Sequence, residues 1–161
     1  MRHKEGRSTR LIAFRTRPLI LELEVREVLM PQDRLDDGQQ FRKARTFGMA
    51  DIRAFAQVSH DAGVHHVEPD ASGRLMVHGL LTATIATELG GELDYIARSM
   101  EFEFLRPVWT GDTIECLATV LSVDERPARW RYEFSFEFSN QDGDLVAKGG
   151  SRGVVLREVV E

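Results

Sequence analysis

One segment, GLLTATIATELGG at residues 79–91, constrains the fold more than any other part of this chain. Leucine, isoleucine and alanine fill most of its positions, and only threonines and one glutamate interrupt them. A helix that is apolar almost all round must be buried on most of its sides. The segment therefore predicts a buried central helix, and the Gly90-Gly91 pair predicts where that helix ends.

Most of the remaining chain alternates apolar with polar residues, as strands with one buried face do. The pattern is clearest in RWRYEFSFEFS (129–139), where aromatic residues alternate with charged residues and serine. Three further segments are expected to be strands: SMEFEFLRPV (99–108), TIECLATVLSV (113–123) and DLVAKGGSRGVVL (144–156). Glycines in the last segment indicate a bulge or close packing. TGD, DERPA and NQDGD have the composition of turns between antiparallel neighbours.

The first third of the chain carries two more predicted elements. LILELEVREVLMP (19–31) alternates as a half-buried strand does, and ADIRAFAQVS (50–59) repeats apolar residues at helical spacing. Thr46 or Asp51 is expected to cap or charge the start of that helix. No element is predicted for FRKARTFG (41–48), which leads into the helix.

Together these elements describe an α+β fold in which an antiparallel sheet wraps around one long central helix. A sheet with one face on a helix leaves an edge or a face free to pair with another copy, so we expect a homodimer. At 161 residues the chain is long enough for one domain with a full hydrophobic core and too short for two.

Composition argues against several classes of protein. Hydrophobic residues make up 42% and charged residues 29%, as in globular rather than disordered chains. The net charge of -5 argues against a nucleic-acid surface, and no apolar run approaches the ~20 residues that span a bilayer. A single cysteine, Cys116, excludes an internal disulfide framework, and its alternating position predicts a packed thiol rather than a nucleophile.

Residues 1–17, MRHKEGRSTRLIAFRTR, differ from the rest of the chain. They hold six Lys/Arg and one Glu, which leaves 15 basic and 25 acidic residues for the remainder. An Arg-rich, acid-poor opening fits an organelle transit peptide, but a poorly ordered basic tail is the simpler interpretation and the one we favour. We expect a basic N-terminal extension at 1–17, one domain at 18–161 and a cytoplasmic location, with the transit peptide as the alternative.

The segment SHDAGVHH (59–66) is the first candidate for chemistry. It places Asp61 and His66 five residues apart, among small residues that favour a loop. A neutral imidazole can take a proton from a water, and a carboxylate can orient that water or share in the transfer. The alternative is that Asp61 caps a turn and His66 packs at a rim.

The second candidate is the start of the predicted central helix, at His78-Gly79. A glycine in the first turn leaves its N–H approachable at the positive end of the helix dipole. Such a donor suits the developing oxyanion of a polarised thioester carbonyl. Alternatively, Gly79 permits a tight entry into the helix and the backbone satisfies His78.

These motifs resemble those of the MaoC-like (R)-specific enoyl-CoA hydratases and 3-hydroxyacyl dehydratases. The hydratase motif of that family reads roughly S-G-D-x-N-P-x-H, against S-H-D-A-G-V-H-H here. EFEFLRPVWTGDTI (101–114) is similar to the family's F-x-R-P-V-x-x-G-D-T-I segment, and the resemblance runs over residues 38–155, about three-quarters of the chain.

The resemblance implies a hot dog fold and a set of site residues. Asp61 and His66 match the family's catalytic acid/base pair. HGLL (78–81) matches its H-G-M/L-L helix start, so that Gly79 would supply the oxyanion N–H beside His78. Thr87 falls on a polar position eight residues later that is usually serine.

The implied activity is reversible hydration of a trans-2-enoyl-CoA to a 3-hydroxyacyl-CoA, with acyl-CoA as substrate and with no metal or redox cofactor. Arg74, Arg98 and Arg106 lie near the segments that would meet the CoA phosphates. Which of the three does so stays open at the level of sequence.

Two departures from the family pattern bear on the chemistry. Gly63-Val64 replaces an Asn-Pro, which removes an amide and a φ-fixing ring beside the pair. A loop left ~1 Å out of place costs about a hundredfold in rate. The segment between His66 and His78 is also shorter than in the family, which can reshape the acyl pocket.

These departures keep two rivals open. The first is a thioesterase on the same fold, with Asp61 or Glu68 activating water against the carbonyl. The second is a domain that binds acyl-CoA without catalysis or depends on a partner subunit. A metal site is disfavoured, because the candidate ligands lack the spacing of a helical HExxH site or a zinc finger. These candidates are His60, His65, His66 and His78, with Asp61 and Glu68.

Overall fold

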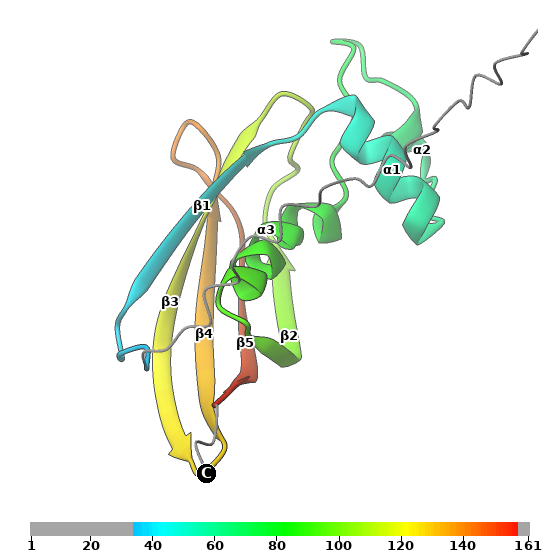
Figure 1. Cartoon of the computed structure of the whole chain (residues 1–161). Helices are drawn as coiled ribbons and strands as arrows, with labels where there is room; N and C mark the ends of the chain where they lie inside the picture. Colours follow the sequence, from blue (N-terminus) through cyan, green and yellow to red (C-terminus); the bar gives the residue numbers. More distant parts are fainter. Residues whose placement is uncertain (1–33, 158–161) are drawn as a thin grey trace, which may run out of the picture.

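The computed structural model describes residues 34–157. The predicted strand at 19–31 and the boundary between residues 17 and 18 lie outside this range. Five antiparallel strands form one sheet in the order β1-β3-β4-β5-β2, and the sheet curves around helix α3 (Figure 1). The strands are β1 (Gln40–Thr46), β2 (Ile96–Phe104), β3 (Thr113–Arg126), β4 (Arg129–Ser139) and β5 (Leu145–Leu156). The helices are α1 (Met49–Ser59), α2 (Val64–Val67) and α3 (Gly79–Glu92).

The core lies between α3 and the inner face of the sheet. The predicted alternation in β4 is confirmed, because the inward residues are buried while their neighbours are half-buried or exposed. The buried row on this strand is Trp130, Tyr132, Phe134, Phe136 and Phe138. On α3 the buried side chains are Leu81, Thr82, Ala83, Ile85, Ala86 and Leu89. The expectation of one helix packed inside an antiparallel sheet is therefore confirmed.

Strand β1 is an element that the sequence did not predict. Its inward side chains are Phe41, Lys43 and Arg45, and two of these are cations. The Lys43 ammonium lies 3.0 Å from Glu88 and also pairs with Glu92, both on α3. Lys43 therefore faces glutamates of α3, while Arg45 pairs with Asp51 of α1 at 2.6 Å. The strand is half-buried without the apolar alternation that identifies strands.

The boundaries of two helices differ slightly from expectation. At α1, the Asp51 carboxylate accepts the Gly48 N–H at 2.8 Å, so Asp51 charges the first turn and Thr46 does not cap it. That hydrogen bond lowers the pKa of Asp51. At α3, Gly90 and Gly91 lie inside the last turn, and the helix continues to Glu92.

Glycines in β5 allow strand β2 to approach closely. A Cβ on Gly149 would lie 2.3 Å from the Glu101 carbonyl oxygen, and a Cβ on Gly153 would lie 2.3 Å from that of Ile96. The prediction of close packing at these glycines is confirmed. Within residues 34–157, no helix is long and apolar enough to cross a membrane.

Candidate active site

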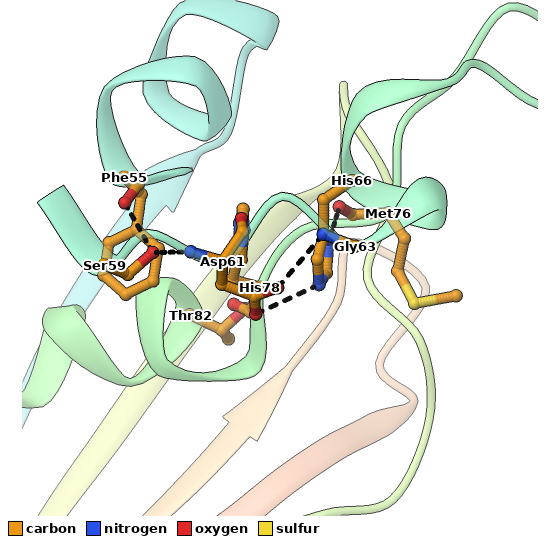
Figure 2. A network of polar contacts seen from close by, with 8 residues as sticks. All are labelled: Phe55, Ser59, Asp61, Gly63, His66, Met76, His78 and Thr82. Carbon is orange, nitrogen blue, oxygen red and sulfur yellow. Dashed lines mark hydrogen bonds and ion pairs between the residues drawn. The ribbon is translucent and has the colours of Figure 1, made fainter. Parts of the chain in front are cut away.

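Three segments meet at the end of the sheet where α1 and α2 lie. They are the loop after α1, the single-turn helix α2, and the start of α3 (Figures 1 and 2). They bring Asp61, His66, His78 and Gly79 together, as the sequence predicted. The fifth residue, Thr87, is on the exposed side of α3, where its hydroxyl donates to the Thr84 carbonyl.

Hydrogen bonds on both sides hold the Asp61 loop. The Ser59 hydroxyl donates to the Phe55 carbonyl at 2.7 Å and accepts the Asp61 N–H at 3.2 Å. One carboxylate oxygen, Oδ1, accepts the Gly63 N–H at 3.1 Å. The other oxygen, Oδ2, faces His66 (Figure 2). The loop therefore fixes Oδ1 of Asp61 and directs Oδ2 toward His66.

His66 is buried, and its main-chain contacts define which ring nitrogen is basic. Its Nδ1 lies 2.7 Å from the Met76 carbonyl oxygen, which can only accept, so Nδ1 carries the proton of the neutral ring. Nε2 is then the unprotonated nitrogen, and it lies 3.9 Å from Asp61 Oδ2. A separation of that length is too long for a direct hydrogen bond and suits one water bound to both atoms.

His78 lies directly behind this pair. Its ring stacks on that of His66, with centroids 3.6 Å apart and planes 18° apart. Its Nε2 lies 3.0 Å from the Asp61 main-chain carbonyl oxygen. The sequence placed His78 beside the oxyanion donor, whereas these contacts connect it to Asp61 and His66.

A pocket of about 460 Å³ opens beside His66 and Gly79. Its other walls include Thr82 on α3, Phe104 at the end of β2, and the segment 105–108. Among the described residues no group accepts the Gly79 N–H. A Cβ on Gly79 would lie 2.9 Å from the Phe104 ring, so glycine lets this ring pack on the start of α3.

Thr82 and Phe104 were not singled out from the sequence. Thr82 follows Gly79 by three residues, a helical spacing that places both on one face and could have identified it. Phe104 carries no such signal, because its proximity to Gly79 depends on β2 occupying the sheet edge beside β5.

Asp61, His66 and His78 are the described residues that come closest to a metal-binding set. One ligand atom from each lies within 4.8 Å of the others. However, the stacked imidazoles have nearly parallel planes, so their lone pairs do not converge on one point. The Nε2–H of His78 is also directed to a carbonyl oxygen. The geometry fits a metal poorly, and the absence of a cofactor stays a prediction.

The buried thiol of Cys116 lies on β3 and points into the core. Burial raises the pKa of the Cys116 thiol to about 12. At neutral pH the residue is therefore a packed thiol and not a nucleophile, as its alternating position predicted.

The Gly63-Val64 backbone already has the geometry of a Gly-Pro or Asn-Pro step. Gly63 has φ -53° and ψ 142°, the extended conformation that a following proline requires, and Val64 is the first residue of α2. No described residue accepts the Val64 N–H. The loop thus holds its conformation without the ring that the sequence lacks.

Val64→Pro is therefore expected to raise the free energy of unfolding by about 0.4–1 kcal/mol, because the proline restricts the unfolded chain. Urea denaturation of both proteins measures the difference. Val67→Pro, at the end of the same helix, is the control and should destabilise. If the Val64→Pro protein were less stable than wild type, the backbone at position 64 would not accommodate a proline ring.

Comparisons with known proteins give a consistent set of relatives. No family model matches the chain. It is 31% identical over 107 residues to the (R)-specific enoyl-CoA hydratase of Aeromonas caviae, a match that covers 60% of this chain and 78% of that protein. It is 28% identical over 129 residues to the mitochondrial 3-hydroxyacyl-[acyl-carrier-protein] dehydratase of Arabidopsis thaliana, covering 74% and 76%. The solved MaoC-like dehydratase of Rhodospirillum rubrum superposes with a TM-score of 0.65 at 26% identity, covering 78% and 96%.

Proposed function

The chain belongs to the MaoC-like family of (R)-specific enoyl-CoA hydratases and 3-hydroxyacyl dehydratases, hydro-lyases with the hot dog fold, and we propose that Asp61 and His66 carry its reaction. The observation that carries the proposal is the pairing of the unprotonated His66 Nε2 with Asp61 Oδ2 at 3.9 Å, beside a pocket that His66 shares with Gly79.

The hydration step uses one water held between the two side chains. His66 Nε2 takes a proton from this water as its oxygen bonds to C3 of a trans-2-enoyl thioester. The electron pair of the double bond moves toward the thioester oxygen, and the Gly79 N–H donates to that oxygen. A proton returns from the pair to C2, which completes a 3-hydroxyacyl thioester, and the reverse sequence eliminates water.

The proposed substrate is an acyl-CoA, because the Aeromonas caviae relative is an enoyl-CoA hydratase by name. The Arabidopsis thaliana relative is named for an acyl carrier protein, so the shared chemistry is an acyl thioester on a phosphopantetheine arm. Of the three candidate arginines, Arg106 lines the pocket and is exposed, whereas Arg74 pairs with Asp70. Arg106 is therefore the proposed contact for the CoA phosphates.

A homodimer is the proposed assembly. Strand β2 lies at an edge of the sheet and exposes Ile96, Met100 and Phe104, with Leu105 directly after it. An apolar edge strand of this kind favours pairing with another chain. Light scattering on the eluting protein measures the mass. A monomer of 18.3 kDa would contradict the proposal.

The expected location is the cytoplasm, with an organelle as the alternative. The Arabidopsis thaliana relative is described as mitochondrial. Residues 1–17 are therefore the segment to test, as a fusion to a fluorescent protein. Diffuse fluorescence would support the cytoplasm, and import of the fusion would support the organelle.

The test of the function is to follow loss of the conjugated-thioester absorbance of a short trans-2-enoyl-CoA, with a thiol reagent in a parallel sample. Absorbance loss without free thiol is the expected result. Thiol release, also from a saturated acyl-CoA, would indicate a thioesterase instead. Binding without either signal, repeated with a longer enoyl-CoA, would indicate a non-catalytic domain.

Gly79→Ala is expected to lower kcat/KM by about 10²-fold. It keeps the oxyanion N–H, but its Cβ displaces the Phe104 ring into the pocket. Gly79→Ala/Phe104→Ala is the matched control, because it removes the contact and should recover part of the loss. If the double variant is no better than Gly79→Ala, the loss does not arise from the Phe104 ring.

A further inference from the structure

His78 has contacts that the proposed reaction does not use. Its side chain is 2% exposed and lies between the rings of Phe55 on α1 and His66 on α2. The centroid of the His78 ring is 5.0 Å from that of Phe55 and 3.6 Å from that of His66. Its Nε2 is 3.0 Å from the Asp61 carbonyl oxygen. One buried side chain thus touches both members of the proposed acid/base pair (Figure 2).

The same contacts define the tautomer of His78. Since a carbonyl oxygen can only accept, Nε2 carries the proton, and Nδ1 is the unprotonated nitrogen. Nδ1 is buried and has no hydrogen-bond partner within the described part of the chain. The contact from Nε2–H to the Asp61 carbonyl is therefore the polar contact by which His78 acts on its neighbours.

We infer that His78 is a positioning residue that sets the geometry of the Asp61–His66 pair, an inference that rests on the proposed function. Its Nε2–H holds the main chain at Asp61, and the face of its ring fixes the plane of the His66 imidazole. The distance from Asp61 Oδ2 to His66 Nε2 thus depends on one side chain that does not itself line the pocket.

Two substitutions separate the two contacts. In His78→Gln the side-chain amide can reproduce the Nε2 donor to the Asp61 carbonyl, but the ring is lost. In His78→Phe the ring remains against His66, but the donor is lost. Each variant is expected to lower kcat by about ten- to a hundredfold, because a small displacement of the pair is costly in rate. KM should change little, because His78 does not line the pocket.

A second readout does not depend on activity. The His66 ring protons lie over the face of His78, so the ring current shifts their NMR signals upfield in the wild type. His78→Gln should move these signals downfield, and His78→Phe should leave them upfield. Thermal unfolding of each variant shows whether the fold is retained.

The control is His60→Asn, which removes an exposed imidazole directly before Asp61 and retains a residue suited to the left-handed conformation of position 60. It should keep the wild-type kcat. A folded His78→Gln protein with wild-type kcat, or with unshifted His66 signals, would overturn the inference. An inactive wild type would count against the proposed function instead, and the His66 signals alone would then decide whether His78 orders this ring.

Discussion

Replacing His66 with asparagine is expected to lower kcat for hydration by about 10²- to 10⁴-fold while the fold remains intact. The asparagine amide takes the place of Nδ1 and can still donate to the Met76 carbonyl, which keeps that buried oxygen paired. Nothing replaces Nε2, so the group that takes the proton from water is absent. Stopped-time assays with a trans-2-enoyl-CoA measure the rate.

Asp61→Asn tests the other half of the pair. Its side-chain oxygen can still accept the Gly63 N–H, so the loop keeps its turn. An amide nitrogen then faces His66 in place of the carboxylate oxygen, and a loss of similar size is expected. His60→Asn, with its side chain exposed, is the control for both variants. If His66→Asn retained most of the wild-type kcat, the base would have to be another residue.

Gly149→Ala is expected to lower the free energy of unfolding by about 3 kcal/mol, a large effect for the addition of one methyl group. The Cβ would lie 2.3 Å from the Glu101 carbonyl oxygen and 2.7 Å from the Phe102 ring. The oxygen belongs to the main chain of β2, so the contact is relieved only when β2 moves away from β5. Urea denaturation measures the change.

Gly91→Ala is the matched control for this substitution. Its Cβ meets nothing within 4 Å, and it lies in the last turn of α3. Alanine there should stabilise by up to about 1 kcal/mol, because glycine is a poor helix former. Equal changes in the free energy of unfolding at both positions would mean that the clash with β2 does not determine the effect of Gly149→Ala.

The sequence predicted the elements whose burial follows from their own residues. The aromatic row of β4 and the apolar helix α3 are examples, because each presents its buried face in a regular period. Strand β1 was missed because its inward Lys43 is matched by glutamates on α3, and that pairing exists only after folding. The single turn of α2 was missed because four residues are too few to show a period.

The candidate site was predictable as a set of residues and not as a geometry. Spacing and resemblance selected Asp61, His66 and Gly79. They carried no information on which nitrogen of His66 is free, because the Met76 carbonyl decides this through the fold. The contact of Phe104 with Gly79 likewise depends on the order of the strands, and Thr87 lies on the exposed side of α3.

The main chain at Met76 holds the His66 ring in a way that does not depend on the length of the segment before it. The Met76 N–H donates to the His65 carbonyl at 3.0 Å, while its own carbonyl accepts His66 Nδ1 at 2.7 Å. Leu75 is tied in turn to Thr110. Residues 67–74 therefore form a loop whose two ends are joined by main-chain hydrogen bonds, and they do not line the pocket. A change in the length of this segment is therefore expected to leave the His66 ring in place, which makes it a permissive position for inserting a tag or a foreign loop.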